Sequence, residues 1–207
     1  MIRLHDYWRS SAAYRLRIAL NLMGVAYEQI AVNLLSGAHK TPAHLALNPQ
    51  GLVPVLEIDG LVMTQSLAII EYLNEAHEAG FLPAHPTGRA RVRALSYAIA
   101  METAPICNLS VRQYVEQESG GAITADGWQL RFISQGLAAF EAMLAHEAGD
   151  FCHGDEISMA DICLVPQLYN ARRAGVDLAA FPLIGAIDAR LAALPPIMAA
   201  LPENNAP

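Results

Sequence analysis

Three polar residues near the start of the chain, Arg9, Ser10 and Ser11, lie where a strand pattern gives way to a helical pattern. Residues 2–7 are typical of a short strand, and apolar residues then recur at helical spacing over residues 11–23. The first turn of a helix carries free backbone N–H groups and a partial positive charge, which together stabilise a thiolate or a carboxylate. We therefore expect anion chemistry at this turn, although the two serines could equally act only as helix caps.

A second polar pair, Gln65 and Ser66, opens another helical pattern directly after a predicted hairpin. Taken alone, this pair is typical of an ordinary helix N-cap. The first strand of the hairpin, residues 52–58, contains Pro54, which cannot donate to a sheet ladder and fits best at the first residue of the strand. Sequence leaves open whether the Val53–Pro54 bond is cis.

The elements that must position these residues alternate in type. The order β-α-β-α-β-β-α over about 80 residues predicts a small α/β layer with a mixed sheet. Its expected strands cover residues 2–7, 26–32, 52–58 and 61–63.

Residues 82–87 form a proline-bearing break, after which no strand pattern recurs. We therefore expect a first domain over residues 1–81, a linker at about 82–87 and an all-helical second domain over 88–207. Its helices are predicted at 89–118 with a kink near Pro105, from Thr124 or Asp126 to 146, from 158 onward, at 182–194 and at 197–201. The final residues, 203–207, are expected to be mobile.

Composition excludes several classes of function. The 207-residue chain is 54% apolar, with a net charge of −7 and no basic run, which disfavours nucleic acid or an anionic membrane as a partner. No apolar run reaches the roughly 18 residues of a membrane span, and no signal-peptide pattern is present. Three widely spaced cysteines favour a reducing, cytoplasmic location, and we expect no metal site because no paired ligand spacing occurs.

Four stretches of this sequence resemble the zeta class of cytosolic glutathione transferases, which includes maleylacetoacetate and maleylpyruvate isomerases. The stretches span most of the chain: Arg9-Ser10-Ser11 with Tyr14 to Leu20; Ala46 to Gln50 with Val53-Pro54; Gln65 to Leu73; and Ala160-Asp161 with Leu164 to Gln167, followed by Asn170-Ala171 and Arg173. The resemblance implies a thioredoxin-like N-terminal domain that binds glutathione, joined to an all-α C-terminal domain that binds the substrate.

The resemblance also implies a set of glutathione contacts. Gln65 and Ser66 would bind the γ-glutamyl carboxylate, and the backbone of Val53, before a cis Pro54, would pair with the cysteinyl part. Ser10 would touch the sulfur, with Ser11 as the second choice, since a hydroxyl donor lowers a thiol pKa. The remaining expected contacts involve the glycine carboxylate, near His39, Lys40 or Gln50, with Gln50 and His39 preferred, and Asn108 from the second domain.

The implied reaction is glutathione-dependent cis-to-trans isomerisation of a maleyl-type diketo dicarboxylate, with Arg9 and Arg173 holding its carboxylates. Both arginines could instead be ordinary surface charges. The sequence departs from the family pattern at three positions, Ala12, Ala104 and Cys107, which leaves the contacts of the second domain open.

Two other functions are compatible with this resemblance. One is a zeta-like transferase that conjugates or dehalogenates small α-halo acids; the other is a non-catalytic, transferase-like scaffold that binds proteins. A scaffold commonly lacks the thiol-activating serine or the Gln-Ser pair, and this chain has both. Family likeness further implies a symmetric homodimer. Sequence does not choose between maleylacetoacetate and maleylpyruvate.

Overall fold

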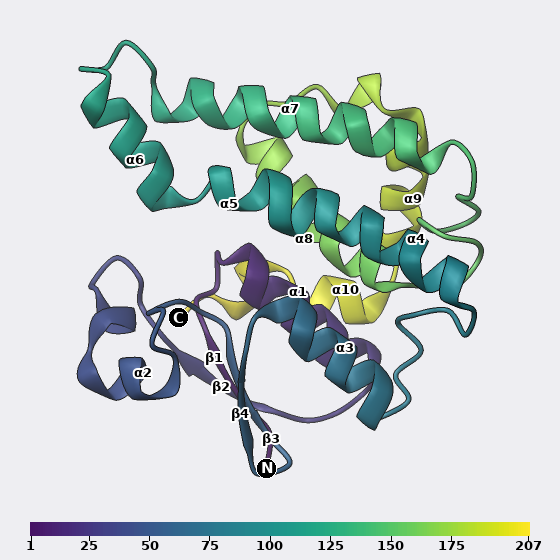
Figure 1. The fold of residues 1–207 in the computed structure, drawn as a ribbon, viewed down its shortest axis with the longest axis horizontal. Coiled ribbons are helices and arrows are strands. Elements are labelled where there is room, and N and C mark those ends of the chain that lie inside the picture. The colour runs from purple at the N-terminus through teal and green to yellow at the C-terminus, as the bar shows by residue number, and fades with distance from the viewer. The chain divides into compact units, whose positions relative to one another are not determined.

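A four-stranded mixed sheet lies at the centre of the first part of the chain, as predicted. In the computed structural model, which describes residues 1–207, the strand order is β2-β1-β3-β4 (Figure 1). Strand β1 runs parallel to β2 and antiparallel to β3, which pairs with β4 through a tight hairpin. The strands are β1 (Arg3–Asp6), β2 (Glu28–Ala31), β3 (Val55–Ile58) and β4 (Leu61–Thr64).

Three α-helices accompany this sheet: α1 (Ser11–Leu22), α2 (Pro42–Leu47) and α3 (Ser66–Ala76). Helix α1 is buried from Ala13 to Leu20 and packs against α3, in which Ile69, Ile70 and Leu73 are buried as well. Each large apolar side chain that is buried in this way stabilises the folded protein by about 1.5–3 kcal/mol. Residues 38–47 contain a 3₁₀-helix (Ala38–Lys40) and then α2, which is the second helix of the predicted order.

The chain divides into two units, residues 1–81 with 193–207, and residues 82–192. The C-terminal residues, which the sequence analysis placed in the helical domain, thus group with the first unit. Helix α10 (Pro195–Ala199) packs on α1, where Asn21 donates a 3.1 Å hydrogen bond to the carbonyl of Pro196. The residues expected to be mobile instead include a 3₁₀-helix (Pro202–Asn205), in which the Asn205 amide donates to the carbonyls of Ala199 and Leu201.

The second unit is entirely helical apart from an isolated bridge. The long helix expected over residues 89–118 is divided around Pro105, where a π-helix precedes a short α5. A proline ring lacks the N–H that a continuous ladder needs, so the break near it is physically reasonable. The helices are α4 (Pro86–Tyr97), the π-helix (Ala98–Thr103), α5 (Ala104–Ile106), α6 (Leu109–Glu118), α7 (Ala125–Leu144), α8 (Met159–Arg173), a 3₁₀-helix (Leu178–Ala180) and α9 (Pro182–Ala192).

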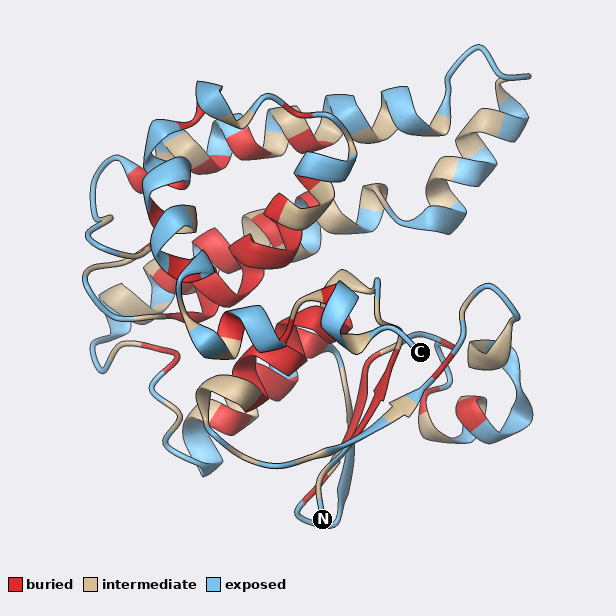
Figure 2. Cartoon of the chain, turned by 180° about the vertical axis from the view of Figure 1, so that it is seen from behind, coloured by how far each residue is buried: buried red, intermediate tan, exposed pale blue.

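Helix α8 lies in the core of the second unit and is buried from Met159 to Leu168, the red helix of that unit in Figure 2. It begins with a capping box, as predicted: Asp161 accepts hydrogen bonds from the backbone and hydroxyl of Ser158, and Ser158 Oγ accepts from the first turn. Asp161 also accepts from the backbone N–H of Cys152 at 2.9 Å. The role of Asp161 is therefore structural.

No helix in the structure has both the length and the apolar character needed to cross a membrane. No group of three or more His, Cys, Asp or Glu side chains is arranged to hold a metal ion.

Candidate functional site

The register of the sheet brings three of the predicted stretches to one end of it. His5 in β1 lies opposite Val55 in β3, and Val55 lies opposite Thr64 in β4. The residues that follow β1, precede β3 and follow β4 must therefore meet at the same sheet end. These residues are the turn before α1, the Val53–Pro54 pair and the start of α3.

Ser10 is the N-cap of α1, and its Oγ accepts a 3.3 Å hydrogen bond from the N–H of Ala13. The turn is closed by a 2.7 Å bond from the N–H of Ser10 to the carbonyl of Tyr7. A hydroxyl that accepts one bond still has its own hydrogen to donate, so capping α1 and contacting an external anion are compatible roles for Ser10.

Arg9 is exposed on this turn, and its guanidinium carbon lies 4.1 Å from the centre of the Trp8 ring. Stacking of this kind stabilises an exposed cation by about 0.5–1 kcal/mol and restricts its orientation. The neighbouring indole therefore holds the Arg9 charge at the end of the sheet.

The N-terminus of α3 has no side-chain cap, unlike those of α1, α2, α7 and α8. Gln65, in the N-cap position, has φ 70° and ψ 104° and makes no capping bond. The alternative that Gln65 and Ser66 form an ordinary N-cap is therefore wrong for Gln65. Residues held in such sparsely populated backbone regions cost about 1–3 kcal/mol and cluster at functional sites. The N–H groups of this first turn therefore have no side-chain acceptor from the N-cap residue, the arrangement that favours an anion at a helix start.

Behind this helix start lies Arg15, a buried residue of α1. Its Nη1 donates a 3.1 Å hydrogen bond to Oγ of Ser66, which is also buried. A guanidinium can only donate, so the Ser66 oxygen is the acceptor and the hydroxyl hydrogen must point elsewhere. Arg15 thus fixes Ser66 as a donor and adds a positive charge beside the start of α3.

Val53 lies just before strand β3, and its peptide bond to Pro54 is cis. The backbone of Val53 makes no hydrogen bond within the chain. The preceding carbonyl, that of Leu52, is held by two side chains from the α2 region, His44 Nε2 and Asn48 Nδ2, each at 2.9 Å. The backbone of Val53 is therefore both positioned and available to pair with an extended ligand.

Gln50 lies next to Gln65, and the two side-chain amides form a 2.8 Å hydrogen bond. Burial, followed by the charge of Lys40, lowers the pKa of His39, so its ring is neutral at neutral pH. Lys40 Nζ lies 3.5 Å from the carbonyl of Gln50. Of the three candidates for a carboxylate at this position, Lys40 is thus the one that carries a charge.

The two predicted residues of the second unit are exposed there. Asn108 is the N-cap residue of α6 and makes no capping bond. Arg173 ends α8, and its guanidinium lies 5.7 Å from the centre of the Tyr169 ring.

Cys107 directly precedes Asn108 in the chain. Burial raises the pKa of its half-buried thiol. The Cys107 thiol is therefore less acidic than an ordinary cysteine thiol.

Sequence reasoning gave no role to four residues of this site: Trp8, Arg15, His44 and Asn48. Asn48 and Arg15 lie inside the stretches that carry the family resemblance, so their position was a signal. The partner of Arg15 lies 51 residues away along the chain, and no local pattern predicts such a contact.

Comparison with known proteins shows the family of this chain. Residues 1–75 match the N-terminal domain of glutathione S-transferase, and residues 129–203 match a C-terminal domain of the same family. Maleylacetoacetate isomerase of Rhizobium meliloti is 59% identical, over 99% of this chain and 97% of that protein. The chain belongs to the glutathione S-transferase family.

Two solved structures define the branch of the family more closely. A maleylpyruvate isomerase, described as a bacterial zeta-class glutathione S-transferase, is 42% identical and superposes with a TM-score of 0.93, covering 98% of this chain and 97% of that one. A maleylacetoacetate isomerase from Anaeromyxobacter dehalogenans, with dicarboxyethyl glutathione and citrate in its active site, is 44% identical with a TM-score of 0.88, covering 99% and 95%.

Proposed function

We propose that this chain catalyses glutathione-dependent cis-to-trans isomerisation of a maleyl-type diketo dicarboxylate, maleylacetoacetate or maleylpyruvate. The observation that carries the proposal is the uncapped start of α3, which lies at the same sheet end as the unpaired backbone of Val53 and the hydroxyl of Ser10. The relatives named as isomerases of these two substrates, at 59% and 42% identity, support it.

The residues at this sheet end fit glutathione group by group. Gln65, Ser66 and the free N–H groups of α3 provide donors for the γ-glutamyl carboxylate. Val53 offers backbone groups to the cysteinyl residue, as in the addition of a strand. Lys40 and Gln50 bind the glycine carboxylate, with the neutral His39 as a hydrogen-bonding neighbour.

When bound, glutathione supplies a thiolate that adds reversibly to the conjugated double bond, which can rotate while it is single. Ser10 donates its hydroxyl hydrogen to the sulfur and, with the N-terminus of α1, holds the thiol in its anionic form. Ser11 is the neighbouring hydroxyl. Arg9 binds a substrate carboxylate and stabilises negative charge that develops on the diketo group, and Arg173 binds the other carboxylate.

The direct test is an assay of the purified protein with maleylacetoacetate and maleylpyruvate, each with and without glutathione, with the product identified by nuclear magnetic resonance. We expect the fumaryl isomer from at least one substrate, glutathione at an unchanged concentration, and no turnover without it. Conjugates of glutathione as the only products would contradict the proposal and would favour the transferase alternative.

We further propose that the protein acts in aromatic catabolism in the cytoplasm, as a homodimer. Three free cysteines support a reducing compartment. The exposed apolar residues Leu61 and Val62 on the edge strand β4 are compatible with a contact between subunits. Light scattering after size-exclusion chromatography tests the dimer, for which we expect twice the chain mass of 22.3 kDa.

A further inference from the structure

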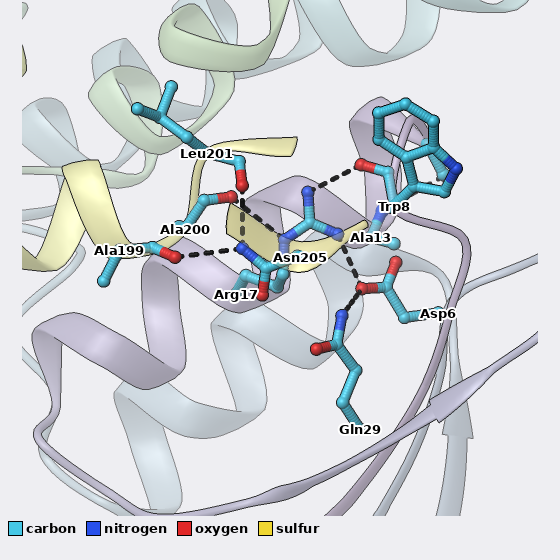
Figure 3. Close-up of polar contacts among 10 residues, drawn as sticks. Asp6, Trp8, Ala13, Arg17, Gln29, Ala199, Ala200, Leu201 and Asn205 are labelled. Atoms are coloured by element: carbon cyan, nitrogen blue, oxygen red, sulfur yellow. Dashed lines mark hydrogen bonds and ion pairs between the residues drawn. The ribbon is translucent and has the colours of Figure 1, made fainter. Parts of the chain in front are cut away.

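Arg17 is a fully buried residue of α1 that is hydrogen-bonded to three different segments of the first unit (Figure 3). Its Nη1 lies 2.6 Å from Oδ2 of Asp6, at the end of β1. Its Nη2 donates at 2.9 Å to the carbonyl of Trp8, in the turn before α1. Its Nε donates at 3.0 Å to the carbonyl of Ala200, in the C-terminal segment.

We propose that Arg17 is a positioning residue for the turn that carries Arg9 and Ser10, with Asp6 and the C-terminal segment as its anchors. This inference rests on the function proposed above. Arg17 and Ala200 are 183 residues apart in the sequence. The hydrogen bond between them therefore links the C-terminal segment to the turn before α1 through the Arg17 side chain.

The contact to Trp8 acts on the site in two ways. Trp8, whose carbonyl accepts the bond from Arg17, lies two residues before Ser10. The ring of Trp8 also stacks with the Arg9 guanidinium. Moving the Trp8 backbone therefore displaces both the hydroxyl proposed to contact the sulfur and the cation proposed to contact the substrate. Displacement of catalytic groups by about 1 Å can reduce turnover about a hundredfold.

The charges around Arg17 explain why a cation can occupy this position. Taking a charge out of water costs several kcal/mol unless partners compensate it. Asp6 provides the opposite charge, and Gln29 donates to the same Asp6 oxygen, while Asp6 Oδ1 is buried without a partner. Filling the core alone would require only an apolar side chain. An apolar residue cannot bond to the three acceptors that the guanidinium spans, which are Asp6 Oδ2 and the carbonyls of Trp8 and Ala200.

The experiment compares Arg17→Lys with Asn21→Ala. Lysine keeps a charge for Asp6 but cannot span the three acceptors of the guanidinium. Asn21 lies one turn further along α1 and donates to the same C-terminal segment, at Pro196, without contacting the turn. It is therefore a matched control for destabilisation. The measurements are the pKa of the bound glutathione thiol, from the ultraviolet absorbance of its thiolate, and kcat and KM for glutathione.

We expect Arg17→Lys to raise the pKa of the bound thiol by about 0.5–1 unit, which corresponds to weakening one hydrogen bond. The value of kcat should fall at least about fivefold, with KM for glutathione changed less than about twofold, because the γ-glutamyl contacts remain. Asn21→Ala should lower the melting temperature but keep the wild-type thiol pKa. A folded Arg17→Lys protein with the wild-type thiol pKa would overturn the inference.

If Arg17→Lys does not fold, Asp6→Asn tests whether Arg17 positions the turn. Asparagine has the shape of aspartate and still offers Arg17 an acceptor, but it removes the negative charge. We expect a smaller rise in the thiol pKa in the same direction, and a wild-type value would overturn the inference. A wild-type protein that binds no glutathione would overturn the proposed function and this inference together. Glutathione binding with unaltered thiol pKa values in the variants would overturn this inference alone.

Discussion

At the scale of single residues, we propose that Ser10 combines its structural role as a helix cap with a chemical role. It caps α1 through its oxygen, and its hydrogen remains for a ligand at the sheet end. Removing the hydroxyl should therefore affect both helix stability and the bound thiol, and the two effects can be separated by measuring them on the same variant.

For Ser10→Ala we expect kcat to fall about tenfold or more, because one charge-assisted donor to the sulfur is lost. The dissociation constant for glutathione should change less than about threefold, since its carboxylate contacts are elsewhere. Thr124→Ala is the matched control, because it also removes an N-cap, that of α7 in the second unit. Steady-state kinetics and calorimetric titration measure both quantities, and unchanged turnover in Ser10→Ala would remove Ser10 from the chemistry.

We propose that Arg15 contributes to glutathione binding rather than to turnover. Replacing it with methionine removes the donor that orients Ser66 and a positive charge beside the start of α3. We expect glutathione to bind about tenfold more weakly, in line with about 1.5 kcal/mol for a charged hydrogen bond, and kcat at saturation to change little. Arg3→Met, which removes an exposed cation of the same unit, is the control. Equal glutathione affinity in both variants would contradict this role.

Sequence identified candidate site residues where a local pattern marks them, at the two strand-to-helix boundaries, and the structure brings these two boundaries to one end of the sheet. Sequence could not assign Arg15 and Arg17, because an arginine in a helix is most often exposed to solvent. Their partners, Ser66 and Ala200, are distant along the chain. The isomer of the Val53–Pro54 bond is likewise set by tertiary structure rather than by the two residues themselves.

At the scale of elements, the start of α8 is the clearest case in which sequence predicts structure. The serine and the carboxylate of its capping box are three residues apart, and both reciprocal bonds form. The sequence predicted a kink near Pro105 but not the π-helix that precedes it. A π-helix depends on packing against neighbouring helices rather than on a local motif.

Asp161→Ala should lower the free energy of unfolding by about 2–4 kcal/mol. The substitution removes the capping box and leaves the buried N–H of Cys152 without its acceptor. Chemical denaturation followed by circular dichroism measures the change. Asp126→Ala, at an exposed carboxylate in the first turn of α7, is the control and should cost less than about 1 kcal/mol. Equal losses in the two variants would contradict the assigned role.

The pairing of β1 with β3 has a predicted dependence on pH. A hydrogen bond with His5, 2.7 Å long, lowers the pKa of Glu57 from its ordinary value of 4.5, with Arg3 adding to the effect. A lowered pKa in the folded state means that this stabilisation is present above pH 4.5 and is lost as the pH falls through the folded value.

Glu57→Gln should therefore be less stable than wild type at pH 7, and the difference should shrink as the pH is lowered below 4.5. Thermal melts from pH 3 to pH 7 measure it. A difference that is constant across this range would show that the Glu57 charge does not contribute to the pairing.

At the scale of the whole molecule, the order of strands and helices predicted the α/β and helical parts of the chain, because hydrophobic periodicity changes after residue 82. The same pattern placed residues 193–207 with the helices that precede them, whereas they group with the first unit. A short amphipathic helix does not encode which surface it covers. The polar contacts of Arg17 and Asn21 with this segment specify that surface.

The most direct test of the site is calorimetric titration with glutathione and with an analogue whose γ-glutamyl α-carboxylate is replaced by a carboxamide. An uncapped helix start beside a buried arginine should discriminate strongly between the charged and the neutral group. We predict that glutathione binds and that the amide binds at least about tenfold more weakly, corresponding to roughly 1.4 kcal/mol. Equal affinities, or no binding of glutathione, would contradict the account.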